Sequence, residues 1–370
     1  MSVTLEQVGA LIEKMAPQKF AEDWDNTGFN LNLHNRDITG IYICLDVTQE
    51  AIRDAADKKC NLIISHHPLL FRAVKRLDNA EYEGKCIQLL MREGISLYCA
   101  HTSIDRAPKG INSWLADIFN LGNRRYLSDE IREPYYEVAV HVPQEQAAQV
   151  RDAMTAAGAG RLGDYSDCTY SIEGNGTFRP DANAHPFIGT ANQMETVKEI
   201  RISSICKKSR LVGVIAAIRS AHPYEEPAIS VLTTEEPVGI EAGLGVVGDL
   251  PAKMTAKKAL DILKKALHTD SVRVAGDLES EVGRIAVCGG AAGEFADAAK
   301  EKGAQMYITG EIKHNFYAAR NGIILVEAGH FDTEKCFCEG YAQGLQNLLN
   351  DVNYNIAIYV ENLRRPYVNY

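Results

Sequence analysis

Residues 61–68 read NLIISHHP, and this stretch decides the fold of the first third of the chain. A short apolar run, 62–64, is followed by a serine, two adjacent histidines and a proline. A brief apolar run of this kind is typical of a buried strand. A strand that merely ended would be followed by Gly, Asn or Asp. The two imidazoles therefore indicate a site at the carboxyl end of a buried strand.

Strands and helices alternate on either side of this stretch. The sequence predicts further strands at 40–48 and 94–101, and helices at 49–59, 82–93 and 111–119. Residues 40–48, GIYICLDVT, are almost continuously apolar, as expected for a strand that is covered on both faces. An alternation of strand and helix predicts an α/β fold with a largely parallel sheet.

The last third of the chain shows the same alternation of predicted strands and helices. We expect strands at 284–290, 304–310, 322–329 and 355–361, with a helix at 291–303. The two ends of the chain, residues 1–129 and 237–370, are therefore predicted to be halves of one α/β layer, which forms a single α/β domain.

The middle of the chain, residues 130–236, has a different pattern. Strands are predicted at 135–142, 199–206 and 229–234, and helices at 144–158 and 211–220. Residues 158–189 are rich in Gly and Asn, and we expect elaborate loops there, because the stretch is too polar and too long for an ordinary connection. This pattern predicts a small ferredoxin-like α+β domain inserted into the α/β domain.

Composition excludes several classes of protein. Hydrophobic residues make up 46% and charged residues 24% of the 370 residues, as in a soluble globular protein. The net charge of −10, without a long basic run, argues against nucleic-acid binding, which needs cations to displace counterions. The sequence shows no signal peptide and no apolar run of membrane-spanning length. Nine cysteines without a CxxC pair indicate buried thiols in the reducing cytoplasm.

Histidines and acids follow several of the predicted strands. In open parallel sheets the carboxyl ends of the strands converge on one crevice, so these side chains can meet. They are His66 and His67, His101 and Asp105, Glu311 and His314, and His330 and Glu334.

Neutral imidazoles and carboxylates are ligands that suit a divalent cation such as zinc, iron(II) or manganese. We predict that His66, His67, Asp105, His330 and Glu334 bind metal. Five ligands with one bridging carboxylate suit two cations about 3.5–4 Å apart. The alternative is that these are ordinary hydrogen-bonded residues at strand ends, which a single histidine usually is.

Three further polar residues, His101, Glu311 and His314, each allow two interpretations. His101 and His314 are either partners of the metal ligands or ordinary polar residues. Glu311 is either a carboxylate that orients a water or binds substrate, or a surface group. If they act, His101, His314 and Glu311 are the candidate catalytic residues that move protons.

Two more motifs are explained better by structure than by chemistry. Residues 289–295, GGAAGEF, could contact an anion at a helix start, but they lack the spacing of a nucleotide-binding loop. A tight turn with close helix packing is the preferred interpretation. Residues 222–228, HPYEEPA, could hold a metal or ligand through His222, Glu225 and Glu226. Two prolines at short spacing favour a rigid turn instead.

Five motifs, in this order along the chain, resemble the NIF3-like proteins, which are also described as GTP cyclohydrolase 1 type 2 homologues. The motifs are AEDWDNTGFNL (21–31), SHHPLLF (65–71), CAHTSIDRAPKGIN (99–112), TGEIKHN (309–315) and EAGHFDTEK (327–335). The insert is similar to that of the longer bacterial members. The resemblance implies a dimetal centre at the five predicted ligands, and a toroidal homohexamer, built as a trimer of dimers, whose insert is like the trimerising PII or CutA domains.

The resemblance also implies an activity. A metal-dependent hydrolase of this kind would act on GTP, open the imidazole ring of guanine and release formate. A metal-binding regulatory or scaffold hexamer without turnover is the alternative from another class. A phosphoesterase that uses the same two metals is a third possibility, because ligand spacing alone does not select a substrate.

Overall fold

The computed structural model describes residues 3–34, 37–318 and 322–367. The chain forms two compact units: unit 1 combines Met1–Ile131 with Ala242–Tyr370, and unit 2 is Arg132–Glu241. Strands β5 (Gly122–Pro143) and β8 (Ile229–Thr255) each run from one unit into the other. No helix among the described residues is both long and apolar enough to cross a membrane.

The first sheet of unit 1 has five strands in the order β1-β4-β3-β2-β13. The strands are β1 (Gly28–Leu31), β2 (Ile41–Cys44), β3 (Leu62–Ser65), β4 (Ser96–Cys99) and β13 (Ile358–Val360). Strands β13, β2, β3 and β4 are parallel and only the edge strand β1 is antiparallel. The largely parallel sheet predicted around residues 61–68 is therefore confirmed.

The C-terminal strands form a second sheet, so the prediction of one shared layer is wrong. Its strands in unit 1 follow the order β8-β10-β11-β12-β9. They include β9 (Arg273–Ala275), β10 (Glu281–Cys288), β11 (Met306–Thr309) and β12 (Ile324–Glu327). Of the C-terminal strands that the structure describes, β13 alone joins the first sheet. The apolar runs predicted the strands correctly, but hydrophobicity carries no information on which strands pair.

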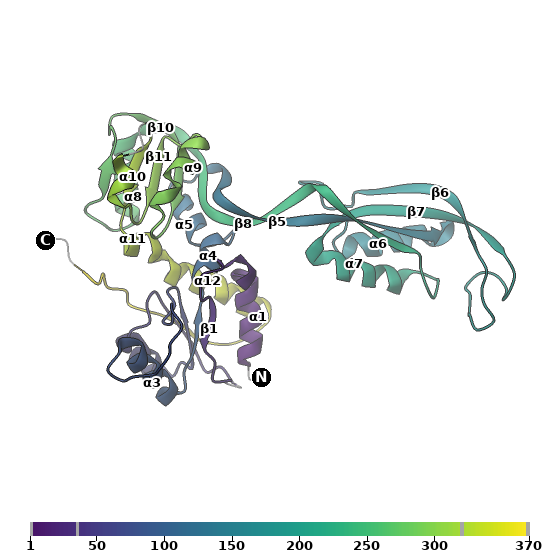
Figure 1. Cartoon of the computed structure of the whole chain (residues 1–370), viewed down its shortest axis with the longest axis horizontal. Helices are drawn as coiled ribbons and strands as arrows, with labels where there is room; N and C mark the ends of the chain where they lie inside the picture. Colours follow the sequence, from purple (N-terminus) through teal and green to yellow (C-terminus); the bar gives the residue numbers. More distant parts are fainter. Residues whose placement is uncertain (1–2, 35–36, 319–321, 368–370) are drawn as a thin grey trace. The chain divides into compact units, whose positions relative to one another are not determined.

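Helices lie between the two sheets and also cover their outer faces (Figure 1). α12 (Cys336–Asp351) packs against β2, α5 (Ile111–Asp117) packs against β10, and α1 (Leu5–Met15) packs against α12. Side chains of both sheets and of these helices, together with α8 (Ala256–Ala266), form one buried core. Burial on both faces explains why the strands read as continuous apolar runs.

The outer faces of the two sheets have their own cores. α2 (Gln49–Asp57) and α3 (Tyr82–Glu93) cover the first sheet, and α9 (Ala296–Glu301) covers the second. Three short helices complete unit 1: α4 (Thr102–Arg106), α10 (His314–Ala318) and α11 (His330–Glu334). Each of these begins within a few residues of the carboxyl end of a strand.

Unit 2 has the element order β-α-β-β-α-β of a ferredoxin-like fold. After β5 come α6 (Ala147–Ala156), β6 (Thr169–Phe178), β7 (Glu195–Lys207) and α7 (Lys208–Ala221), followed by β8. The strand order is β6-β7-β5-β8. Side chains of β5, β7, α6 and α7 form the core of this unit.

Strand β6 corrects the expectation of loops at 158–189. It pairs antiparallel with β7 over its whole length, from Thr169 opposite Ser204 to Phe178 opposite Glu195. Most of its side chains are exposed, so the sequence shows no alternation of apolar and polar residues. Backbone hydrogen bonds to β7, rather than burial, make this polar segment a strand.

Candidate metal centre

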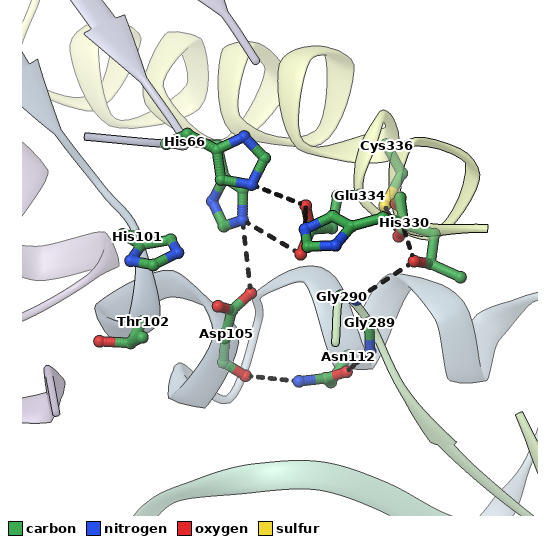
Figure 2. A network of polar contacts seen from close by, with 12 residues as sticks. His66, His101, Thr102, Asp105, Asn112, Gly289, Gly290, His330, Glu334 and Cys336 are labelled. Atoms are coloured by element: carbon green, nitrogen blue, oxygen red, sulfur yellow. Dashed lines mark hydrogen bonds and ion pairs between the residues drawn. The ribbon is translucent and has the colours of Figure 1, made fainter. Parts of the chain in front are cut away.

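Three segments of unit 1 bring imidazoles and carboxylates together, each just beyond the end of a strand. His66 and His67 follow β3. After β4, His101 is the N-cap residue of α4 and Asp105 lies within that helix. His330 and Glu334 are the first and last residues of α11, after β12. Figure 2 shows His66, His101, Asp105, His330 and Glu334 gathered around one place. All five predicted metal ligands therefore lie in one cluster.

His66 is fully buried and lies at the centre of this cluster. Its Nδ1 donates a hydrogen bond of 3.1 Å to the carbonyl oxygen of Ala100, which fixes the tautomer. Its Nε2 lies 3.6 Å from Oε1 of Glu334 and 3.9 Å from Oδ1 of Asp105. Among the residues that the structure describes, this buried nitrogen has no hydrogen-bond partner, and a buried polar atom of that kind calls for an explanation.

His67 and His330 are oriented in a similar way. Nδ1 of His67 lies 2.8 Å from the carboxylate of Asp46, and Nδ1 of His330 lies 2.7 Å from that of Glu311. The Nε2 atoms of both rings lie 3.0 Å from Oε2 of Glu334. In each ring, Nδ1 donates its proton to a carboxylate. If the ring is neutral, its Nε2 carries a lone pair, and this lone pair would be repelled by the lone pairs of Glu334. A positive charge, either a proton or a metal ion, has to lie between them.

The pKa shifts show that these imidazoles and carboxylates act on one another. Burial raises the pKa of Glu334, but the neighbouring His66, His330 and His67 outweigh it and hold that pKa well below its usual range. Burial lowers the pKa of His67, but hydrogen bonds with Asp46 and Glu334 raise it to about 10. Burial raises the pKa of Asp105, and His66 opposes this only partly.

His101 belongs to the same cluster and is held by Asp25. Its Nδ1 lies 2.8 Å from Oδ1 of Asp25, whose other oxygen accepts hydrogen bonds from the backbone and hydroxyl of Thr102. Burial raises the pKa of Asp25, but hydrogen bonds from His101, Thr102 and Thr27 outweigh this and lower it. The ring centroid of His101 lies 5.3 Å from that of His66.

The other two candidate catalytic residues occupy different positions. Glu311 holds the ring of His330, so its carboxylate is already engaged. His314 is exposed at the start of α10, and within the described part of the chain it has no recorded contact with the cluster. A hollow of ≈ 690 Å³ adjoins Glu311 and His330.

Glycines at the ends of β10 and β11 leave room for the cluster. Gly290 has a φ of +67°, and a Cβ atom there would overlap Oε1 of Glu334. A Cβ at Gly310 would lie 2.8 Å from Oγ1 of Thr333 and 2.9 Å from Cα of His330. The GGAAGEF motif thus acts through close packing against α11, as preferred from the sequence.

A buried asparagine connects the two halves of the cluster. Nδ2 of Asn112 donates to the carbonyl oxygen of Asp105 at 2.9 Å, and its Oδ1 accepts from the backbone of Gly289 at 2.9 Å (Figure 2). Asn112 therefore ties α4 to the residue that follows β10.

Two groups of ring nitrogens and carboxylate oxygens are close enough to bind a cation. They are His66 with His67 and His101, and His67 with His330 and Glu334; within each group the candidate ligand atoms lie within 4.8 Å of one another. The residues fit a divalent cation, because imidazole Nε2 atoms held through Nδ1 are the usual arrangement around such ions. The unpartnered Nε2 of His66 is the observation that such an ion best explains.

Asp25 and Asp46 were missed as site residues by the sequence reasoning. Asp46 lies two residues after the end of β2, so the same argument from strand ends that selected His66 could have found it. Asp25 lies before β1, an edge strand that the sequence did not predict, and only the motif around it pointed there.

The HPYEEPA motif in unit 2 is a hydrogen-bonded turn. Nε2 of buried His222 donates to the carbonyl oxygen of His141 at 2.8 Å, and its Nδ1 accepts from the backbone of Tyr224 at 3.0 Å. Both ring nitrogens are used, so His222 has none left for a metal.

The chain resembles known proteins over its whole length. It is 36% identical to a GTP cyclohydrolase 1 type 2 homolog of Bacillus subtilis over 363 residues, which cover 97% of this chain and 96% of that protein. A homologue of the same description from Listeria monocytogenes is 38% identical over 327 residues, 87% of each chain. The crystal structure of a Bacillus cereus protein related to NIF3 superposes with a TM-score of 0.92 at 34% identity, covering 100% of both chains. The model of the Duf34/NIF3 (NGG1p interacting factor 3) family matches residues 3–366, and the chain belongs to this family.

Proposed function

We propose that this protein is a metal-dependent hydrolase whose centre holds two divalent cations. The observation that carries the proposal is the buried Nε2 of His66, which has no hydrogen-bond partner in the described part of the chain and lies 3.9 Å from Asp105 and 3.6 Å from Glu334. Burying such an atom without a partner is costly. A cation bound there would remove that cost.

The geometry of Glu334 supports two cations rather than one. Its Oε1 faces His66, whereas its Oε2 faces His67 and His330. A carboxylate whose two oxygens face different imidazoles is suited to bridge two ions. Asp105 would complete the first position, and His101 lies close enough to His66 and His67 to contribute.

Two such cations would lower the pKa of a water molecule and polarise the bond under attack. The chain itself orients the ligands. Asp46 and Glu311 keep protons on Nδ1 of His67 and His330, so that both Nε2 lone pairs face inward. Asp25 does the same for His101. His67 and His330 are partly exposed, so the cluster is open to a substrate on that side.

GTP is the proposed substrate, because the relatives carry the description GTP cyclohydrolase 1 type 2 homolog. The reaction would open the imidazole ring of guanine and release formate. Zinc is the proposed metal, although the same ligands accept iron(II) or manganese. A phosphoesterase reaction at the same centre is the second candidate, since two bridged cations serve it equally well.

We also propose a homohexamer, arranged as a toroidal trimer of dimers, in which the insert resembles PII or CutA domains. The ferredoxin-like order of unit 2 supports this, as do exposed apolar side chains on its strands, such as Tyr170, Ile172 and Leu232. A regulatory hexamer without turnover is the alternative.

All nine cysteines are free thiols, which supports a cytoplasmic location.

Metal analysis and formate release together test the function. Purified protein should contain two equivalents of metal per chain, and His67→Ala and Glu334→Ala should each lower this number. Metal-dependent formate release from GTP should be lost in Asp105→Ala. Unchanged stoichiometry in both ligand variants would refute the two-metal centre. Phosphate release in place of formate would support the phosphoesterase, and metal without any turnover would support the regulatory alternative.

A further inference from the structure

Two exposed aromatic rings stand beside the candidate metal centre. Trp24 is 59% exposed and Phe71 is 52% exposed, and their ring centroids lie 5.9 Å apart. The edge of Trp24 also meets His101, with 6.0 Å between the ring centroids. Exposed aromatic rings that adjoin one another, next to a polar cluster, are typical of a ligand-binding surface.

The loops that carry these rings are tied together by hydrogen bonds. The side chain of Asn26 donates to the carbonyl oxygen of Leu70 at 2.5 Å, and the backbone of Leu70 donates to Asn30 at 3.2 Å. Asn30 in turn donates to the carbonyl oxygen of Asn26 at 2.9 Å. These bonds join the two loops next to Trp24 and Phe71, so less loop ordering is needed when a ligand binds.

Three cations follow Phe71 in the same loop. Arg72, Lys75 and Arg76 are exposed, and no ion pair is found for them within the described part of the chain. The chain as a whole has a net charge of −10, so this basic segment stands out against an acidic background. The hollow beside His330 is less suited to an anion than this basic segment. Its lining has three carboxylates and only two cations: Glu311, Glu327 and Asp332 against Arg273 and Lys313. A polyanion is favoured on the Phe71 side.

We propose that Trp24 and residues 71–76, here called the aromatic-basic rim, bind a ligand with a planar heteroaromatic ring and a polyanionic tail. A nucleoside triphosphate has this chemistry. Its ring would stack on Trp24 and Phe71, beside His101, and its phosphates would lie near Arg72, Lys75 and Arg76. The inference rests on the proposed function, because it concerns the substrate of that same centre.

Tryptophan fluorescence tests the ring contact directly. The chain has two tryptophans, and Trp114 packs against the core, so the Trp114→Phe variant leaves Trp24 as the single reporter. Adding GTP should quench Trp24, guanosine should quench it at higher concentration, and inorganic triphosphate should not. Equilibrium dialysis of GTP against wild type and Trp24→Ala gives the same information if Trp114→Phe does not fold.

Two sets of variants separate ring from phosphate contacts. Trp24→Ala should weaken binding of both GTP and guanosine by about tenfold, because it removes the ring on which the base would stack. Replacing Arg72, Lys75 and Arg76 together by Ala should weaken GTP binding, reduce its salt dependence and leave guanosine binding unchanged. Tyr165→Ala, which removes a 75% exposed ring in unit 2, is the matched control for the first set. Replacement of Lys257, Lys258 and Lys265, exposed cations on α8, is the control for the second.

The outcomes distinguish this inference from the proposed function. GTP that binds and quenches Trp24 without release of formate or phosphate supports the rim and refutes the hydrolase. Formate release with an unchanged KM in Trp24→Ala refutes the rim and leaves the hydrolase intact. Absence of GTP binding to wild type also refutes the rim. If Trp24→Ala changes the oligomeric state but not GTP binding, the rings form a contact between subunits and the inference is wrong.

Discussion

Nδ1 of His67 and Oδ1 of Asp46 lie 2.8 Å apart, so the ring of His67 is held with its other nitrogen directed at Glu334. This contact predicts that Asp46→Asn weakens metal binding about 10–100-fold, because a carboxylate partner orients the ring and raises its basicity. Titration of metal-free protein followed by calorimetry measures the affinity. Asp57→Asn, an exposed acid on α2, is the control, and equal affinities in the two variants would contradict the assignment.

Glu311→Gln should have a similar effect through His330, whose Nδ1 lies 2.7 Å from the Glu311 carboxylate. If Glu311 acts only by holding this ring, then metal affinity falls and turnover of fully loaded protein changes little. If Glu311 moves protons during the reaction, turnover falls at saturating metal. Formate release at increasing zinc concentration distinguishes the two roles. Glu83→Gln, on the exposed side of α3, serves as the control.

Gly290→Ala should disrupt the centre more than it strains the backbone. Gly290 and Gly94 have nearly the same φ, +67° and +69°, but a Cβ at Gly290 would overlap the carboxylate of Glu334 whereas a Cβ at Gly94 meets nothing within 4 Å. Gly94→Ala should therefore cost only about 1–2 kcal/mol of backbone strain. Gly290→Ala should cost more and also lose metal. Unfolding in urea together with metal content compares the two, and equal effects would show that Glu334 can move away freely.

Asn112→Leu should destabilise unit 1, because it leaves the carbonyl oxygen of Asp105 and the backbone N–H of Gly289 without a partner. Losing a buried partner costs about 1–3 kcal/mol per group. Thermal unfolding by circular dichroism measures the effect, with the exposed Asn347→Leu on α12 as the control. A melting temperature equal to that of the control would mean that water replaces Asn112 fully.

His222 predicts a pH dependence of stability in unit 2. Burial lowers the pKa of His222, whereas its hydrogen bond to His141 and the charge of Glu199 raise it. Burial has the larger effect, so the pKa is lowered overall. The unfolded chain then binds more protons than the folded chain, so the free energy of unfolding should fall as the pH drops through the ordinary histidine pKa of about 6.5. Its stabilising contribution is fully present above that pH.

Hydrogen exchange of unit 2 at pH 7.5 and pH 5.5 measures this effect. Protection of β5 and α7 should be weaker at the lower pH in wild type, and His222→Gln should reduce the difference. His185→Gln, which changes a histidine in an exposed loop of the same unit, should leave it unchanged. A pH dependence that persists fully in His222→Gln would place its origin in another group.

Much of the fold could be predicted from local pattern. The strand ending at Ser65 and the helix Tyr82–Glu93 have the boundaries expected from apolar runs and helix periodicity. Strand β6 could not be predicted, because its exposed polar side chains carry no pattern and its partner β7 supplies the hydrogen bonds. The second sheet of unit 1 was missed for a related reason, since strand pairing is a long-range choice.

The sequence by itself determined that imidazoles and carboxylates follow the ends of several buried strands, because short apolar runs and the residues after them are local features. It also determined the ligand types and hence the class of ion. Only the tertiary structure decided that His66 and Glu334, 268 positions apart in the numbering, lie 3.6 Å from each other. It alone showed that Asp25, Asp46 and Glu311 hold three of the rings. The physical reason is that packing of two sheets around shared helices sets these distances, and no local preference of the chain encodes them.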